Sequence, residues 1–174
     1  MRSYVIRQVK EEIRVLGVAA KKDEDSEGYH IVGAVYRGSL YLDGVMATGA
    51  RGPDVTEETV EMITASPHHP QIRVILTDAG LLDGSTIDPL ALSEATSRPI
   101  IALGHEQEAT NGVSTEKFHL VVDDTVIPVL SVGLKERLAR QVLGMATRDS
   151  GLPEALRVAG LTVSALSESF QHNI

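Results

Sequence analysis

Residues 72–103, IRVILTDAGLLDGSTIDPLALSEATSRPIIAL, contain the stretch that decides the fold class. Its two apolar runs, 72–77 and 99–103, are each short enough to be a buried strand. Between them, Asp88 stands where a helix N-cap belongs and Pro89 takes the first helical position. A helix that connects two neighbouring strands makes them parallel, so this stretch predicts a parallel βαβ unit.

The chain before this unit has the pattern of an antiparallel meander. Residues 12–20 alternate weakly around a β-branched centre and predict a strand with at least one buried face. Two further strands are expected at 29–36 and 40–50, because a short Gly-containing connection joins them as in a β-hairpin. The polar residues 21–28 are typical of a solvated loop.

A helix is predicted to join the meander to the βαβ unit. Asp54 stands at a possible N-cap, with Glu57 three positions later as in a capping box, and the helix should cover residues 54–65. The pair His68-His69 then lies between prolines, which is typical of a turn.

The rest of the chain adds two short strands and two helices. The expected elements are a loop at 104–116, strands at 118–122 and 126–132, and helices at 134–145 and 154–166. No repeat or linker divides the sequence, so we expect one domain over residues 1–174. The predicted fold class is α/β, with antiparallel strands one to three followed by parallel βαβ units in a mixed sheet flanked by helices.

The composition excludes several classes of protein. The 174 residues carry 16 Lys and Arg against 24 Asp and Glu, a net charge of −8 at pH 7, which argues against a general nucleic-acid coat protein. Aromatic residues make up 3% of the chain, too few for a base-stacking platform, and the absence of Cys excludes disulfides and zinc-thiolate sites. No apolar run is long enough to span a bilayer, so we expect a cytoplasmic protein that contacts no membrane.

Carboxylates are the remaining candidates for chemistry, because the sequence has no phosphate-binding glycine loop, nucleophile elbow or zinc-protease motif. Asp78 ends a predicted parallel strand, where α/β sheets gather their sites and where an Asp can bind a divalent metal. An Asp in this position also commonly caps a turn. Metal-assisted phosphoryl chemistry needs further carboxylates, and Asp23, Asp25 and Asp83 lie on loops that could fold over Asp78.

The chain resembles a known family over roughly Lys10 to Ser167. The resemblance rests on the order and spacing of several segments, of which LPEALRVAGL at 152–161 is the most specific. The other segments are EIRVLGV at 12–18, VGAVYRG at 32–38, LDGV at 42–45 and RVILTD at 73–78. Together they resemble the archaeal domain of unknown function numbered ninety-nine, which is similar to endonuclease V and its ribonuclease-H-like fold.

The resemblance implies a magnesium- or manganese-dependent nuclease site, and this chain departs from it. Asp78 matches the aspartate that ends the family's fourth strand. The acid expected on the first strand falls at Ala19-Ala20, and the acid expected after the third strand falls near Gly49. One carboxylate cannot hold and orient the ions of a two-metal site, so the resemblance implies a catalytically degenerate nuclease-like protein that binds nucleic acid.

Two other functions remain open. The first is an active metal-dependent endonuclease that completes the Asp78 site with Asp23, Asp25 or Asp83. The second is an α/β scaffold or homo-oligomeric interaction module that shares only the fold with the family.

Basic residues gather late in the chain and bear on nucleic-acid binding. Lys135, Arg137 and Arg140 on the predicted helix 134–145 could contact phosphates if they share one surface, although a solvated helix face also explains them. Arg157 lies within an apolar run and is expected to pair with Glu154 or Asp78.

Overall fold

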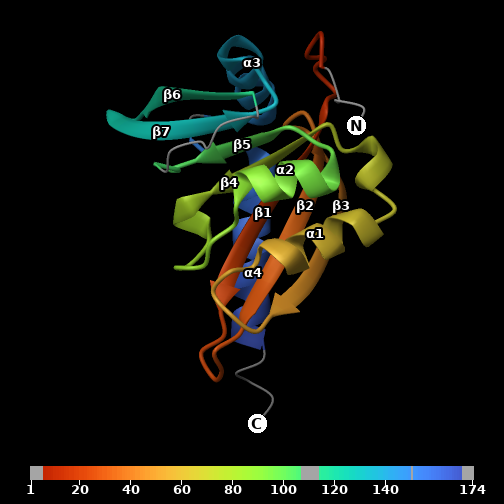
Figure 1. The fold of residues 1–174 in the computed structure, drawn as a ribbon, viewed down its shortest axis with the longest axis vertical. Helices are drawn as coiled ribbons and strands as arrows, with labels where there is room; N and C mark the ends of the chain where they lie inside the picture. Colours follow the sequence, from red (N-terminus) through yellow and green to blue (C-terminus); the bar gives the residue numbers. More distant parts are fainter. Residues whose placement is uncertain (1–5, 107–113, 150, 170–174) are drawn as a thin grey trace.

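The computed structural model describes residues 6–106, 114–149 and 151–169, and its seven strands form one sheet in the order β3-β2-β1-β4-β5-β7-β6 (Figure 1). The strands are β1 Arg14–Lys22, β2 Tyr29–Arg37, β3 Tyr41–Ala50, β4 Val74–Asp78, β5 Ile100–Leu103, β6 Thr115–Val122 and β7 Thr125–Val132. The helices are α1 Thr56–Ala65, α2 Pro89–Thr96, α3 Glu136–Ala146 and α4 Glu154–Ser169, with short 3-10 helices at His69–Gln71 and Ala79–Leu81.

The strand pairing confirms the predicted fold class. Strands β1, β2 and β3 form an antiparallel meander, and β4 lies parallel to both β1 and β5. Strands β5, β7 and β6 then pair antiparallel and complete a mixed sheet. As predicted, the Asp88 side chain caps α2 by accepting hydrogen bonds from the amides of Leu90 and Ala91 at 2.9 and 3.2 Å.

The predicted capping box at the start of α1 is wrong. Val55, not Asp54, is the N-cap residue, and no side chain caps this helix. The Asp54 carboxylate instead accepts hydrogen bonds from the amide and hydroxyl of Thr56, and Asp54 forms an isolated bridge with Thr86. The long-range bridge holds the backbone of Asp54 outside the helix, which a local sequence pattern does not indicate.

Other boundaries differ by a few residues. Strand β6 begins at Thr115, so it takes the end of the predicted loop 104–116, and residues 107–113 of that loop lie outside the described residues. Helix α3 begins at Glu136, two residues later than predicted, and Met145 is exposed rather than part of the buried face.

Helices cover both faces of the sheet. In Figure 1, α1 and α2 lie in front of the strands and α4 runs behind β1 and β2. Alternate residues of β1 face opposite sides, so Leu16, Val18 and Ala20 pack into the core on the α1 and α2 side. Ala19 packs on the other side, in a cluster with residues of β2 and α4.

Helix α4 lies directly on β1 at Gly17. A Cβ at Gly17 would collide with the carbonyl carbon of Ala155 and would lie 2.5 Å from the amide nitrogen of Leu156. Both of these atoms belong to the backbone of the first turn of α4, so they cannot rotate away as a side chain could. Only a glycine allows the helix to pack this close to the strand.

We predict that Gly17→Ala lowers the free energy of unfolding by about 3 kcal/mol or more, because α4 must move away from β1. Urea denaturation measures the change. Gly144→Ala on α3 is the matched control, since no atom lies within 4 Å of its added Cβ. It should be neutral or stabilising by up to about 1 kcal/mol. Equal effects of the two substitutions would contradict the proposed role of the Gly17 contact.

Candidate functional site

Asp78 is the last residue of β4 and lies at the carboxyl edge of the parallel strands. Its Oδ1 accepts a hydrogen bond of 2.8 Å from the amide of Gly80, which makes Asp78 the N-cap of the short helix Ala79–Leu81. Burial raises the pKa of the Asp78 carboxyl above its ordinary value, against a smaller lowering effect of the Gly80 hydrogen bond. Asp78 therefore occupies the predicted site position and also caps a turn.

The neighbouring position on β1 carries no acid and has no open space. Val18 pairs with Thr77, so Ala19 and Asp78 are the next residues of two parallel strands and face the same side of the sheet. Ala19 is fully buried and packs with Ala159 and Val163 of α4. Ala20, on the opposite face, is also buried.

Hydrogen bonds to nearby backbone or side-chain groups occupy two of the three loop carboxylates, those of Asp23 and Asp83. Asp83 accepts a hydrogen bond of 2.9 Å from the amide of Lys22, at the end of β1. Asp23 accepts one bond of 3.0 Å from the amide of Asp25 and another from the hydroxyl of Ser26, and the first of these is the main cause of a lowered Asp23 pKa. Asp25 itself is exposed.

These carboxylates do not assemble into a metal centre in the described part of the chain. Within residues 6–106, 114–149 and 151–169, no three His, Asp or Glu side chains are close enough together to hold a metal ion. His105 follows the end of β5, near the same edge of the sheet, and burial lowers the pKa of its imidazole.

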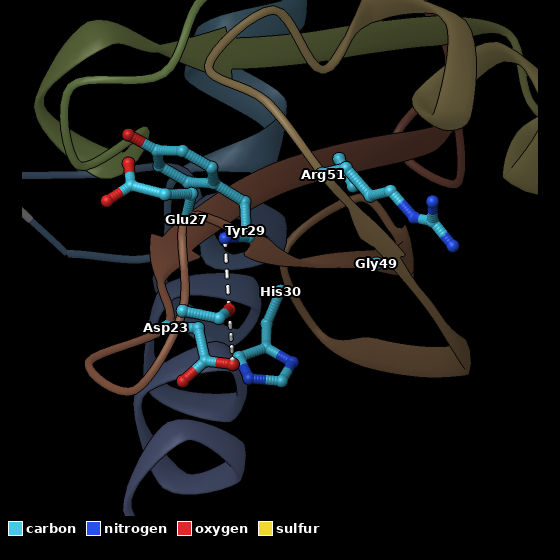
Figure 2. Close-up of a pocket in the computed structure, with 9 residues that line it drawn as sticks. Asp23, Glu27, Tyr29, His30, Gly49 and Arg51 are labelled. Carbon is cyan, nitrogen blue, oxygen red and sulfur yellow. Dashed lines mark hydrogen bonds between the residues drawn. The ribbon is translucent and has the colours of Figure 1, made fainter.

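A pocket of about 550 Å³ opens at the end of the meander, beside Gly49. Figure 2 shows Asp23 and Glu27 on one side of this pocket and Arg51 on the other, with His30 beside Asp23. The sequence indicated Asp23 as a possible metal ligand and Gly49 as a position without its expected acid, but it did not point to His30 or Arg51. Strand register, and not sequence spacing, brings these residues together. The strand patterns at 29–36 and 40–50 were the feature of the sequence that could have indicated the pairing of His30 with Gly49.

The basic residues of α3 lie at the other end of the sheet. Val132, which ends β7, pairs with Ile100 at the start of β5, whereas Asp78 pairs with Leu103 at its end. Helix α3 therefore begins at the edge opposite Asp78.

Two of these three basic side chains have acidic partners. Lys135 pairs with Glu116 at 2.9 Å, and Arg140 pairs with Glu136 at 2.8 Å and lies over the Phe118 ring. Arg137 is exposed. The predicted nucleic-acid-binding group is thus partly neutralised and lies far from Asp78 along the strands.

Arg157 pairs with Glu154, one of its two expected partners, and not with Asp78. Its Nε and one terminal nitrogen donate hydrogen bonds of 3.0 and 2.8 Å to the two carboxylate oxygens of Glu154. The hydrogen bond from Arg157 is the main cause of a lowered Glu154 pKa. This pair stabilises the first turn of α4, next to its contact with Gly17.

Comparisons with known proteins agree with this fold. A family model described as endonuclease dU matches residues 11–116. A UPF0215 protein from Methanopyrus kandleri is 31% identical, and the match covers 94% of this chain and 95% of the relative.

Two solved structures share the fold at low sequence identity. A protein of unknown function from Archaeoglobus fulgidus has a TM-score of 0.70 and 20% identity, covering 88% of this chain and 97% of that one. Endonuclease V from Bacillus subtilis has a TM-score of 0.62 and 12% identity, covering 92% and 82%. These matches confirm the resemblance seen in the sequence and the mixed sheet that it implied.

In the described part of the chain, no helix is both long and apolar enough to cross a membrane.

We predict that Asp78→Asn stabilises the protein at pH 7. Because burial raises the pKa of Asp78, the folded state binds the proton more tightly than the unfolded state, and the ionised carboxylate costs stability above that pKa. Asn removes the charge and keeps the acceptor for Gly80. Thermal unfolding should show a higher Tm for the variant at pH 7 and no difference below the ordinary pKa of 3.8. A lower Tm at pH 7 would indicate a partner that stabilises the carboxylate.

We also predict that Ala19→Asp lowers the free energy of unfolding by about 2–4 kcal/mol, because it buries a carboxylate beneath α4 without a partner. Ala47→Asp on the exposed side of β3 is the control and should change stability little. Urea denaturation of both variants measures the difference. Wild-type stability in Ala19→Asp would show that the structure has room for an acid at this position.

Proposed function

We propose that this chain, which belongs to the endonuclease dU family, binds nucleic acid without cutting it. The family is described as endonuclease dU, so DNA that contains deoxyuridine is the substrate class to test. Among the described residues, no three His, Asp or Glu side chains come together at Asp78, as metal-dependent cleavage would need.

The observation that carries this proposal is the burial of Ala19 beside Asp78. A carboxylate at this point would share a divalent ion with Asp78, since the two residues face the same side of adjacent parallel strands. The methyl group of Ala19 instead packs against α4. Asp78 alone supplies one negative charge, whereas a divalent ion in a phosphoryl-transfer site needs several oxygen ligands.

The loop carboxylates support the same conclusion. Asp83 binds the backbone of β1 and Asp23 binds its own turn, so recruiting either one as a metal ligand would break these hydrogen bonds. The negative charge of the whole chain implies weak, salt-sensitive binding to nucleic acid through a local surface.

We expect the purified chain to bind single-stranded DNA containing one deoxyuridine at low salt and to leave it intact with Mg²⁺ or Mn²⁺. Fluorescence anisotropy measures binding, and a denaturing gel measures cleavage. Asp78→Asn should change neither result.

Cleavage that depends on Asp78 and failure to bind DNA would each overturn the proposal. Metal-dependent cleavage that Asp78→Asn abolishes would mean that other carboxylates complete an active site. Cleavage that persists in the variant would instead indicate a contaminating nuclease, and a repurified sample must then give none. Failure to bind DNA at low salt would favour the alternative function, an α/β scaffold that shares only its fold with the family.

A further inference from the structure

Three residues form a row across the end of the meander, on the face that α4 covers further along. Lys21 pairs with His30 across β1 and β2, and His30 pairs with Gly49 across β2 and β3. Directly opposed residues of antiparallel strands share a face and have Cβ positions about 5 Å apart. Arg51 follows just after β3 and lines the same pocket as His30 and Gly49. Together with Arg51, the row therefore places two cations and an imidazole around a glycine.

Gly49 leaves this surface open. It is exposed, and a Cβ added there would meet only the carbonyl oxygen of Tyr29, at 3.5 Å. A ligand can therefore approach the backbone of β3 between His30 and Arg51 without displacing a side chain.

The acidic residues of the pocket already have compensating partners. Asp23 accepts two hydrogen bonds within its turn, from the amide of Asp25 and the hydroxyl of Ser26. Glu27 pairs with Lys22 at 3.6 Å. Glu24 and Asp25 are exposed on the same turn but are not among the residues that line the pocket.

Lys21 and Arg51 differ from these acids in having no ion pair to any described residue. Figure 2 shows the guanidinium of Arg51 directed away from Asp23 and Glu27. On the Gly49 side of the pocket, Arg51 thus presents a positive charge without an ion-pair partner among the described residues, and the acidic turn bounds the pocket on the other side.

We infer that a phosphodiester backbone lies across Gly49, between Lys21, His30 and Arg51. This inference rests on the proposed nucleic-acid binding and names its surface. Lys21 lies two residues beyond Ala19 on β1, about 7 Å further along the strand, so the bound strand passes close to the edge that Asp78 occupies.

Fluorescence anisotropy with a labelled single-stranded DNA, measured over a series of KCl concentrations, tests the surface. Lys21→Ala and Arg51→Ala should each weaken binding about three- to tenfold and lower the slope of log K against log salt by about 0.7. Glu27→Gln should tighten binding, because it removes a negative charge from the pocket. Lys10→Ala is the matched control, since Lys10 is exposed near the start of β1 at the opposite edge, and should bind like the wild type.

The outcomes separate this inference from the proposed function. If the wild type does not bind DNA, the proposed function fails and the surface fails with it. If the wild type binds and neither Lys21→Ala nor Arg51→Ala changes the affinity or the salt slope, only the surface is wrong. Weaker binding in Arg137→Ala alone would also overturn it and place the DNA on α3. Arg51 lies outside the strands, so its variant keeps the test valid if Lys21→Ala does not fold.

Discussion

The packing of the first turn of α4 against Gly17 is the contact on which the rest of this structure depends. Since glycine has no side chain, the backbone of Ala155 and Leu156 can lie directly on β1. That contact sets the path of α4 over β1 and β2, where Ala159 and Val163 bury Ala19. The Glu154–Arg157 pair stabilises the same turn, so one close approach organises a whole face of the sheet.

This packing also decides the chemistry at the carboxyl edge of β4. A helix that lies this close to the strand needs small residues beneath it, and a small apolar residue at Ala19 cannot bind a metal ion. Asp78 is then left half-buried, with a raised pKa and a hydrogen bond from the Gly80 amide. Tight packing and a charged metal site compete for the same space, because a buried carboxylate needs compensating charge that Ala159 and Val163 cannot provide.

Charge is distributed unevenly over a protein that is acidic as a whole. The basic residues of α3 stand at the edge opposite Asp78, and two of them pair with glutamates. Lys21 and Arg51, near the end of the meander, have no such partners among the described residues. A net charge of −8 therefore does not exclude the proposed nucleic-acid binding, but it would limit that binding to a small surface and to low salt.

Local patterns in the sequence determined the order and type of the elements, the parallel βαβ unit and the Asp88 cap, because each depends on residues close together in the chain. The position of Asp78 at the end of β4, and the lack of acids at Ala19 and Gly49, were also evident from sequence. Only the tertiary structure decided that Asp54 bridges to Thr86 rather than capping α1, and that Arg157 binds Glu154. It also placed His30 between Lys21 and Gly49, since cross-strand register joins residues that sequence spacing keeps apart.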